Sequence, residues 1–206
     1  MQTNTYFMRY VSGSRIAALA VVMLIGCRSG KDQPSGKAPE PAATTSAPAA
    51  QTKPAPAVIR IRAGDTAPFK DSGGNVWLAD QGFADGETTL RGGDLKIENT
   101  QDPGLYRAER YSMTAFSYPL ANGQYTVKLH FAETFEGVTG PGQRVFSFNV
   151  QGREFKDFDV WTKAGGPLRA YVETVPVEIT GGKLDIKFTP NIENPEINGI
   201  EIIPGS

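Results

Sequence analysis

The chain has very little cysteine and histidine, with one residue of each among 206. A lone cysteine, Cys27, leaves no partner within the chain for a disulfide, so the folded part must be held together by packing. With His130 as its one histidine, the sequence shows no Ser/His/Asp order, no metal-ligand cluster and no phosphate-binding glycine loop. We therefore expect no cofactor and no metal site, and we predict His130 to be an exposed strand residue.

Excess charge of either sign is also missing. The 21 Lys and Arg residues and the 22 Asp and Glu residues give a formal net charge of −1. A nucleic-acid partner requires a basic surface that releases counterions from phosphates. We expect no nucleic-acid partner.

The apolar run at residues 16–25 is too short to span a bilayer as a mature helix. It follows Arg9 and Arg15, and a positive segment before a short apolar run is typical of an export signal. The run leads into Leu24-Ile25-Gly26-Cys27, which resembles the bacterial lipoprotein box, in which the cysteine becomes the lipidated first residue of the mature protein. The alternative is an ordinary secretory signal with a coincidental cysteine.

We therefore predict a lipoprotein signal peptide over residues 1–26 and lipidation at Cys27, which would anchor the protein in a membrane of the cell envelope. Residue 28 is Arg, and the inner-membrane retention signal, an Asp directly after the cysteine, is absent. In an organism with two membranes, the outer membrane is the expected location. The following segment is rich in Pro and Ala and has no aromatic residue, so residues 27–57 are predicted to form a disordered tether.

Helical periodicity is missing after residue 57, whereas period-two alternation is frequent. In residues 124–133, Tyr125, Val127, Leu129 and Phe131 alternate with polar residues, directly after an Asn122-Gly123 hairpin signal. Similar runs predict about ten short strands, with turn signals every eight to twelve residues, among them 58–62, 105–111, 113–118, 146–150, 175–179, 183–188 and 197–203. This pattern predicts one all-β domain over residues 58–206, folded as an antiparallel β-sandwich.

Four runs in this domain resemble the malectin family of carbohydrate-binding domains: Leu105–Tyr111, Phe116–Tyr118, Asn122–Glu133 and Asn194–Ile202. The likeness covers roughly residues 58–204, and several motifs agree in order. It implies a jelly-roll sandwich of the galactose-binding-like type. It also implies an oligosaccharide or polysaccharide as the ligand.

The resemblance also implies site residues. Tyr111 and Glu193 match ligand-contacting positions of the family, while Phe135 and Glu136 fall where the family has a tyrosine and a phenylalanine. Phe83 is a further candidate, because its spacing with Trp77, Asp80 and Gly86 resembles the family's pattern in a loop that helps form the sugar site. Sugars need flat apolar faces and hydrogen-bonding groups for their hydroxyls, and these residue types supply both. Because Phe135 lacks a hydroxyl and Glu136 lacks a ring, the family's glucose-disaccharide specificity is not carried over.

Each aromatic or charged candidate also has a structural interpretation. Tyr111 could be hydrogen-bonded inside the sandwich, Glu193 could cap the Asn194-Pro195 turn, and Phe83 could belong to the core. Trp77 is expected in the core, and Trp161 as a plug at the edge of the sandwich rather than as a second aromatic contact. Tyr106 and Tyr118 are also expected in the core, and Arg107 and Glu109 share a strand face and could pair with each other.

An enzyme is the competing function, because glycoside hydrolysis uses two carboxylates across a cleft. Candidates for that pair are Glu133, Glu136, Asp157, Asp159 and Glu193. A single sandwich with shallow loops offers little room for a cleft that excludes water, so we predict a binding protein without catalytic activity. The alternative is a protein-interaction or cell-envelope structural module with an envelope protein as its partner.

Overall fold

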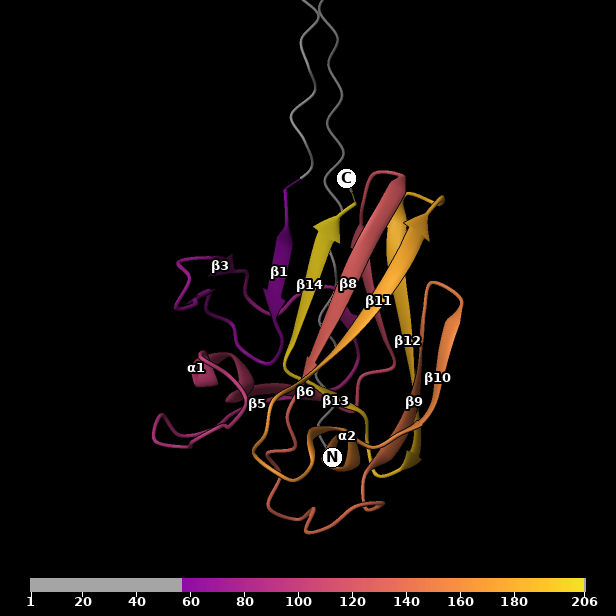
Figure 1. Ribbon diagram of the computed structural model, residues 1–206. Coiled ribbons are helices and arrows are strands. Elements are labelled where there is room, and N and C mark those ends of the chain that lie inside the picture. Colours follow the sequence, from indigo (N-terminus) through magenta and orange to yellow (C-terminus); the bar gives the residue numbers. More distant parts are fainter. Residues whose placement is uncertain (1–56, 206) are drawn as a thin grey trace, which may run out of the picture. The chain divides into compact units, whose positions relative to one another are not determined.

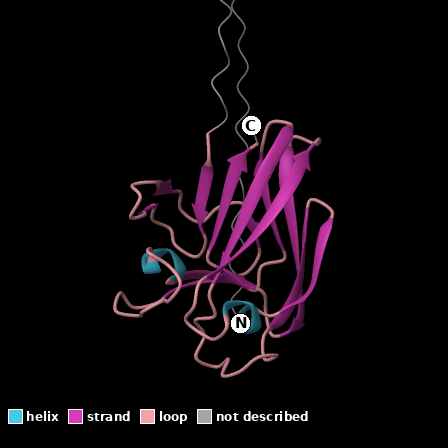
Figure 2. Cartoon of the chain, in the orientation of Figure 1, coloured by secondary structure: helices cyan, strands magenta, loops and turns pink. Residues whose placement is uncertain are grey.

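The computed structural model describes residues 57–205. The predictions of a signal peptide, of lipidation at Cys27 and of a tether concern residues 1–57, which lie outside this part of the chain except for Ala57. Strands dominate the described residues, and helices are short (Figure 2). Among residues 57–205, no helix is long and apolar enough to cross a bilayer.

Two antiparallel sheets form the body of the domain (Figure 1). The first has four strands in the order β1 (Ile59–Arg62), β14 (Gly199–Pro204), β8 (Gly123–Phe131) and β11 (Tyr171–Ile179). The second has five strands in the order β10 (Arg153–Phe158), β9 (Val145–Val150), β12 (Lys183–Ile192), β7 (Ala115–Pro119) and β4 (Phe83–Ala84).

The hydrophobic core lies between these sheets. Strand β9 buries every second residue, Phe146, Phe148 and Val150, as its period-two sequence predicts. The alternating residues of β8, β11 and β12 meet them in the same cluster. Phe148 packs edge-on against Phe158, with ring centroids 5.0 Å apart. The prediction of an all-β antiparallel sandwich is confirmed.

A second, smaller core covers part of the outer face of the four-stranded sheet. It contains Trp77, Ile97, Leu105 and Tyr106, and it confirms the expectation that Trp77 and Tyr106 are buried. The expectation for His130 was wrong, because its side chain is only 9% exposed. Its ring packs edge-on against Trp77 at 5.2 Å, and its Nδ1 lies 2.9 Å from the Tyr106 hydroxyl. The alternation in β8 suggested that His130 faces solvent, but the second core covers the outer face of the sheet here, so both faces of β8 are buried at this end.

The segments of this layer pair into two further sheets. One consists of β13 (Glu196–Ile197), β6 (Ala108–Tyr111) and β5 (Glu87–Leu90), and the other of β2 (Phe69–Lys70) and β3 (Val76–Trp77). In all, the described residues form fourteen strands, more than the predicted ten, because several have only two residues.

Two short helices replace predicted strand or loop. Helix α1 (Pro103–Tyr106) occupies the start of the expected strand 105–111, since Pro103 begins the helix with a preset φ angle. Helix α2 (Val160–Ala164) occupies an expected loop. The Asp159 carboxylate accepts a hydrogen bond from the Thr162 N–H, and Gly165 ends the helix at a φ of 78°. These are ordinary capping signals, and they were visible in the sequence.

The strand registers show which parts of the chain lie at each end of the domain. Pro204 pairs with Tyr125 near the start of β8, and Ile59 pairs with Ile202, so both described chain ends lie beside that start. The Gly205 N–H donates to the Gln124 carbonyl at 2.7 Å and fixes the last residue there. Strand β8 runs from this end to Phe131, and the loop that follows lies at the opposite end (Figure 1).

Candidate functional site

The loop after β8 presents an aromatic ring to solvent. Phe135 is 45% exposed, and its backbone N–H donates to the Glu133 carboxylate at 2.9 Å. Its ring lies over the Arg144 guanidinium at 5.9 Å. A Cβ atom at Gly137 would come within 2.5 Å of the ring, so only glycine leaves room for this ring position. The loop thus holds Phe135 in a defined orientation.

One side of Phe135 borders a small pocket of about 260 Å³. Four separated segments of the chain contribute to it: the end of β5 with the residue after it, the end of β6, the loop after β8 and the loop after β12. The lining residues are Thr89, Arg91, Tyr111, Phe135, Arg144, Glu193 and Asn194. The structure therefore brings three of the sequence-predicted residues together, Tyr111, Phe135 and Glu193.

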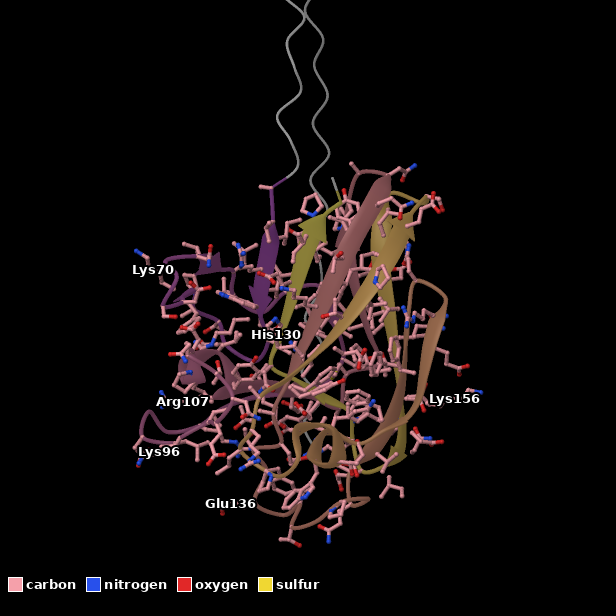
Figure 3. The ribbon with its side chains drawn as sticks, viewed as in Figure 1. Lys70, Lys96, Arg107, His130, Glu136 and Lys156 are labelled. Carbon is pink, nitrogen blue, oxygen red and sulfur yellow. The ribbon has the colours of Figure 1, made fainter. Side chains whose placement is uncertain are left out.

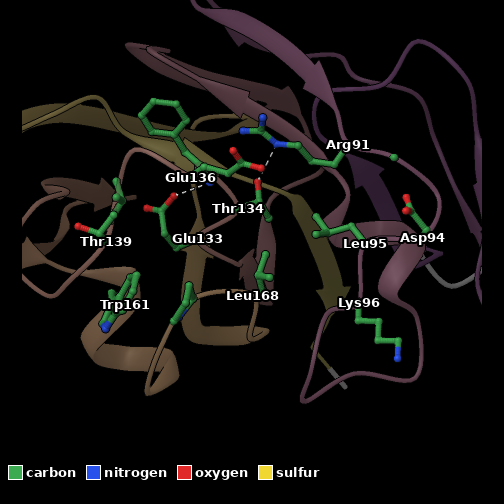
Figure 4. Close-up of a pocket in the computed structure, with 14 residues that line it drawn as sticks. Arg91, Asp94, Leu95, Lys96, Glu133, Thr134, Glu136, Thr139, Trp161 and Leu168 are labelled. Atoms are coloured by element: carbon green, nitrogen blue, oxygen red, sulfur yellow. Dashed lines mark hydrogen bonds between the residues drawn. The ribbon is translucent and has the colours of Figure 1, made fainter.

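A larger pocket of about 700 Å³ is also bordered by Phe135 (Figure 4). Arg91 lines it as well, so these two residues are shared by both pockets. Glu136 lines the larger pocket, on a loop at the end of the domain opposite the chain ends (Figure 3). Leu95, Lys96, Trp161 and Leu168 contribute further walls.

A buried ionic network supports the small pocket from below. Arg144, whose side chain is 5% exposed, lies between the carboxylates of Glu133 at 2.8 Å and Glu109 at 4.0 Å. Arg91 donates to Glu109 at 3.3 Å and to the Thr134 hydroxyl at 3.2 Å. Thr134 in turn donates to Glu109 at 2.6 Å. Arg144 is thereby fixed at the floor of the small pocket, and Arg91 is fixed at the wall between the two pockets.

Glu196 is the third carboxyl of this region and is fully buried. Neither of its oxygens has a hydrogen-bond partner among the described residues. Burial, and then the nearby Glu109 and Glu133 carboxylates, raise the pKa of Glu196 well above its usual value, against the smaller opposing effect of Arg144. Burial also raises the pKa of Glu133, although Arg144 opposes this. Its burial beside two arginine-paired carboxylates therefore favours the protonated form of Glu196.

The remaining sequence-predicted residues are placed as follows. Phe83 lies outside both pockets, in edge strand β4, where it packs on Phe116 at 5.0 Å and under Arg110 at 5.4 Å. Glu193 lines the small pocket and also caps its turn, because its carboxylate accepts from the Asn194 N–H at 3.2 Å. Tyr111 is half-buried at the pocket wall. Trp161 is half-buried and lines the larger pocket.

The suggested Arg107–Glu109 pair is wrong. Arg107 follows helix α1 instead of sharing a strand face, and its Nε donates to the Leu95 carbonyl at 2.8 Å. Glu109 turns into the buried network with Arg91. Sequence reasoning missed Arg91 and Arg144 because the carboxylates that they pair with lie elsewhere in the chain. It missed Glu196 because nothing in the run from Asn194 to Asn198 marks this carboxyl as buried.

The carboxylates considered for catalysis have other partners. Asp159 caps α2 and accepts from the Gly142 N–H, and Asp157 accepts from Asn191 at 3.1 Å. Glu133 is 1% exposed and ion-paired with Arg144. Within residues 57–205, no group of three His, Cys, Asp or Glu side chains is arranged to hold a metal ion.

Comparison with known proteins gives a consistent result. A family model described as the Malectin domain matches residues 57–200. A probable leucine-rich repeat receptor-like serine/threonine-protein kinase of Arabidopsis thaliana is 37% identical over 142 residues, which cover 60% of this chain and 14% of that protein. Malectin-B of Xenopus laevis is 29% identical over 126 residues, 52% of this chain and 45% of that protein. The chain thus spans less than half the length of either relative.

Solved structures share the fold at low identity. The extracellular domain of ANXUR1 from Arabidopsis thaliana superposes with a TM-score of 0.63 at 18% identity, covering 71% of this chain and 47% of that one. A Bacteroides uniformis beta-glucuronidase superposes with a TM-score of 0.65 at 19% identity, covering 73% of this chain and 18% of that one. Since the family model matches well over half of the sequence, this chain belongs to the malectin domain family.

Proposed function

We propose that this domain binds carbohydrate without catalysis and that the chain is held at a membrane by lipid on Cys27. The observation that supports binding most strongly is the small pocket. Tyr111, Phe135 and Glu193 match or replace ligand-contacting positions of the family, and all three line this one pocket although they are far apart in the chain. The sequence resemblance picks out these three residues one by one, and the fold then brings them to the same pocket.

The chemistry of the pocket suits a sugar. The exposed ring of Phe135 offers a flat apolar face for the C–H side of a pyranose, and Tyr111 offers a second ring with a hydroxyl. Glu193 can accept hydrogen bonds from sugar hydroxyls, and Arg91 can donate them. A few stacking contacts of about 0.5–1.5 kcal/mol each, reduced by the cost of immobilisation, give affinities on the order of micromolar to millimolar.

The carboxylates support binding rather than hydrolysis. A glycosidase places two carboxyl groups across the scissile bond. Here Glu133 is buried in an ion pair, whereas Glu136 and Glu193 line different pockets. The small pocket is therefore lined by a single carboxylate, Glu193, which argues against paired-carboxylate hydrolysis there.

The test is a glycan array probed with the purified full chain, followed by titration calorimetry of each hit. We expect the double variant Tyr111→Ala/Phe135→Ala to lose at least tenfold in affinity while its melting temperature stays within a few degrees of wild type. Val76→Ala, an exposed residue outside both pockets, is the matched control. A folded chain that binds no glycan, or a double variant that binds like wild type, would reject this site and favour the protein-interaction module.

The lipid anchor is a separate part of the proposal. Its support is the Leu24-Ile25-Gly26-Cys27 sequence after a short apolar run. We expect wild type to sediment with membranes and to incorporate labelled fatty acid, and Cys27→Ser to do neither. Label incorporated into the Cys27→Ser variant would disprove lipidation at this residue.

A further inference from the structure

The larger pocket has no role in the contacts described so far. Its volume of about 700 Å³ lies in the range typical of small-molecule sites, whereas the 260 Å³ of the small pocket lies just below that range. Neither Tyr111 nor Glu193 lines the larger pocket. The two pockets meet at Arg91 and Phe135, which line both. A chain-like ligand held in the small pocket could therefore continue past Phe135 into the larger one.

The walls of the larger pocket combine the two surfaces that a sugar requires. Trp161, Leu95 and Leu168 provide apolar area, and Figure 4 shows them facing the same space as Thr134 and Glu136. Polar groups of both signs surround them, including Lys96 and Asp94. With cations and anions both present, the lining suits a neutral hydroxyl-rich ligand better than a polyanion.

One residue of these walls, Leu168, has an uncommon backbone conformation. Leu168 has a φ of 53°, and the other non-glycine residues with positive φ in the described chain are all polar. A bulky apolar residue rarely adopts this conformation. Two backbone hydrogen bonds fix it, from the Leu168 N–H to Glu133 at 2.9 Å and from the Glu98 N–H to Leu168 at 2.8 Å. Such strain persists where the surroundings determine it, and it is common at ligand sites.

Trp161 is fixed in a similar way. It lies in the first turn of α2, whose start is capped by Asp159 and whose end is formed by Gly165. The helix is anchored by Val160, which is fully buried in the main core. The indole is therefore presented to the pocket by a supported element rather than by a loose loop.

From these observations we infer that the larger pocket is a second subsite for the same glycan chain, which rests on the function proposed above. The ligand is a neutral oligosaccharide with at least one more sugar unit than the small pocket holds. Phe135 separates consecutive units, Arg91 donates to hydroxyls on either side of it, and Trp161 provides the apolar face for the additional unit.

The experiment is titration calorimetry of the purified full chain with neutral gluco-oligosaccharides of two, three and five units, in β-1,3, β-1,4 and α-1,4 linkage. We expect affinity to rise at least tenfold from two to five units in the linkage that binds. Trp161→Ala should remove this rise while leaving the affinity for the two-unit probe unchanged, and Trp161→Phe should restore most of it. Lys96→Ala, at an exposed position of the same pocket, should weaken only the longer probes. It serves as the second test if Trp161→Ala does not fold.

Two results overturn the inference and are distinguishable from failure of the proposed function. Wild type could bind the five-unit probe no more tightly than the two-unit probe, in which case the small pocket is the whole site. Alternatively, Trp161→Ala could weaken all lengths equally, which would mean that Trp161 acts through the small pocket. If neither these probes nor any glycan of the array binds, the proposed function fails, and the second subsite fails with it.

Discussion

Leu168 combines an apolar side chain with a backbone conformation that glycine adopts far more easily. At its φ of 53°, any Cβ atom is strained, whereas glycine is not. We expect Leu168→Gly to be more stable than Leu168→Ala by about 1 kcal/mol, the reverse of the usual order of these residues. Both variants lose the same partly buried side chain beyond Cβ, so the difference isolates the backbone.

Urea denaturation of the two variants provides the measurement. A matched pair at a position with negative φ, Val76→Gly and Val76→Ala in strand β3, should show the ordinary order, with Ala more stable. Equal stabilities at position 168 would show that the left-handed conformation is relaxed in solution and that this wall of the larger pocket is not held in place.

Strand β13 contains a fully buried carboxyl, that of Glu196, at a position where an apolar side chain would be expected. Because burial raises the pKa of Glu196, the folded state keeps its proton at pH values at which the unfolded chain has released it. A raised acid pKa contributes stability at low pH that is lost as pH rises from the unfolded value of about 4.5 towards the folded value. The loss is about 1.4 kcal/mol per pH unit within this window.

Glu196→Gln keeps the shape and removes the titration. We expect its free energy of unfolding, relative to wild type, to increase with pH from 4.5 upwards at about that slope. Chemical denaturation at half-unit pH steps measures it. A constant difference across the window would mean that Glu196 is ionised in the folded state, with Arg144 as its counterion.

At the scale of strands, much could be predicted from the sequence. The period-two runs of β8, β9 and β11 predicted their positions and inward faces. The hairpin predicted at Asn122-Gly123 was wrong, because β7 and β8 on either side of it lie in different sheets, so this segment connects the two sheets. The burial of His130 could not be predicted, because the layer that covers it comes from a segment with little periodicity. For the site, family motifs selected Tyr111, Phe135 and Glu193, which the fold brings together. Phe83 was selected by its spacing with Trp77, Asp80 and Gly86, and it packs elsewhere.

The buried charges could not be predicted for another reason. Glu109 interacts with Arg91, which lies 18 residues before it, and with Arg144, which lies 35 residues after it (144 − 109). Nothing local in their sequence distinguishes these residues from surface charges. Only the tertiary contact converts them from solvated side chains into the support of a pocket.

The stability of the whole domain depends on pH through groups with opposite effects. Burial lowers the pKa of His130 to about 4, so this ring stays neutral in the fold while the unfolded chain takes up a proton near pH 6.5. A lowered histidine pKa gives stability that is complete above 6.5 and lost as pH falls towards 4. Between pH 4.5 and 6.5 this loss on acidification opposes the gain from Glu196 and Glu133.

We therefore expect wild-type stability to vary weakly with pH across this window. His130→Gln should remove the histidine contribution. The free energy of unfolding of this variant should therefore decrease as pH rises from 4.5 to 6.5. The difference in free energy of unfolding between wild type and variant should change by roughly 3 kcal/mol over these two pH units. Parallel wild-type and His130→Gln profiles would show that the imidazole titrates equally in both states.

The two ends of the domain have a practical consequence for how it can be displayed. The described chain ends meet beside the start of β8, while both pockets open near the far end of this nine-residue strand, roughly 30 Å away. A sensor chip, a bead or a fluorescent fusion attached directly at Ala57 or Gly205 would therefore lie away from the binding face. The same geometry makes the domain suitable as an oriented capture reagent, since every immobilised copy would present its pockets outward.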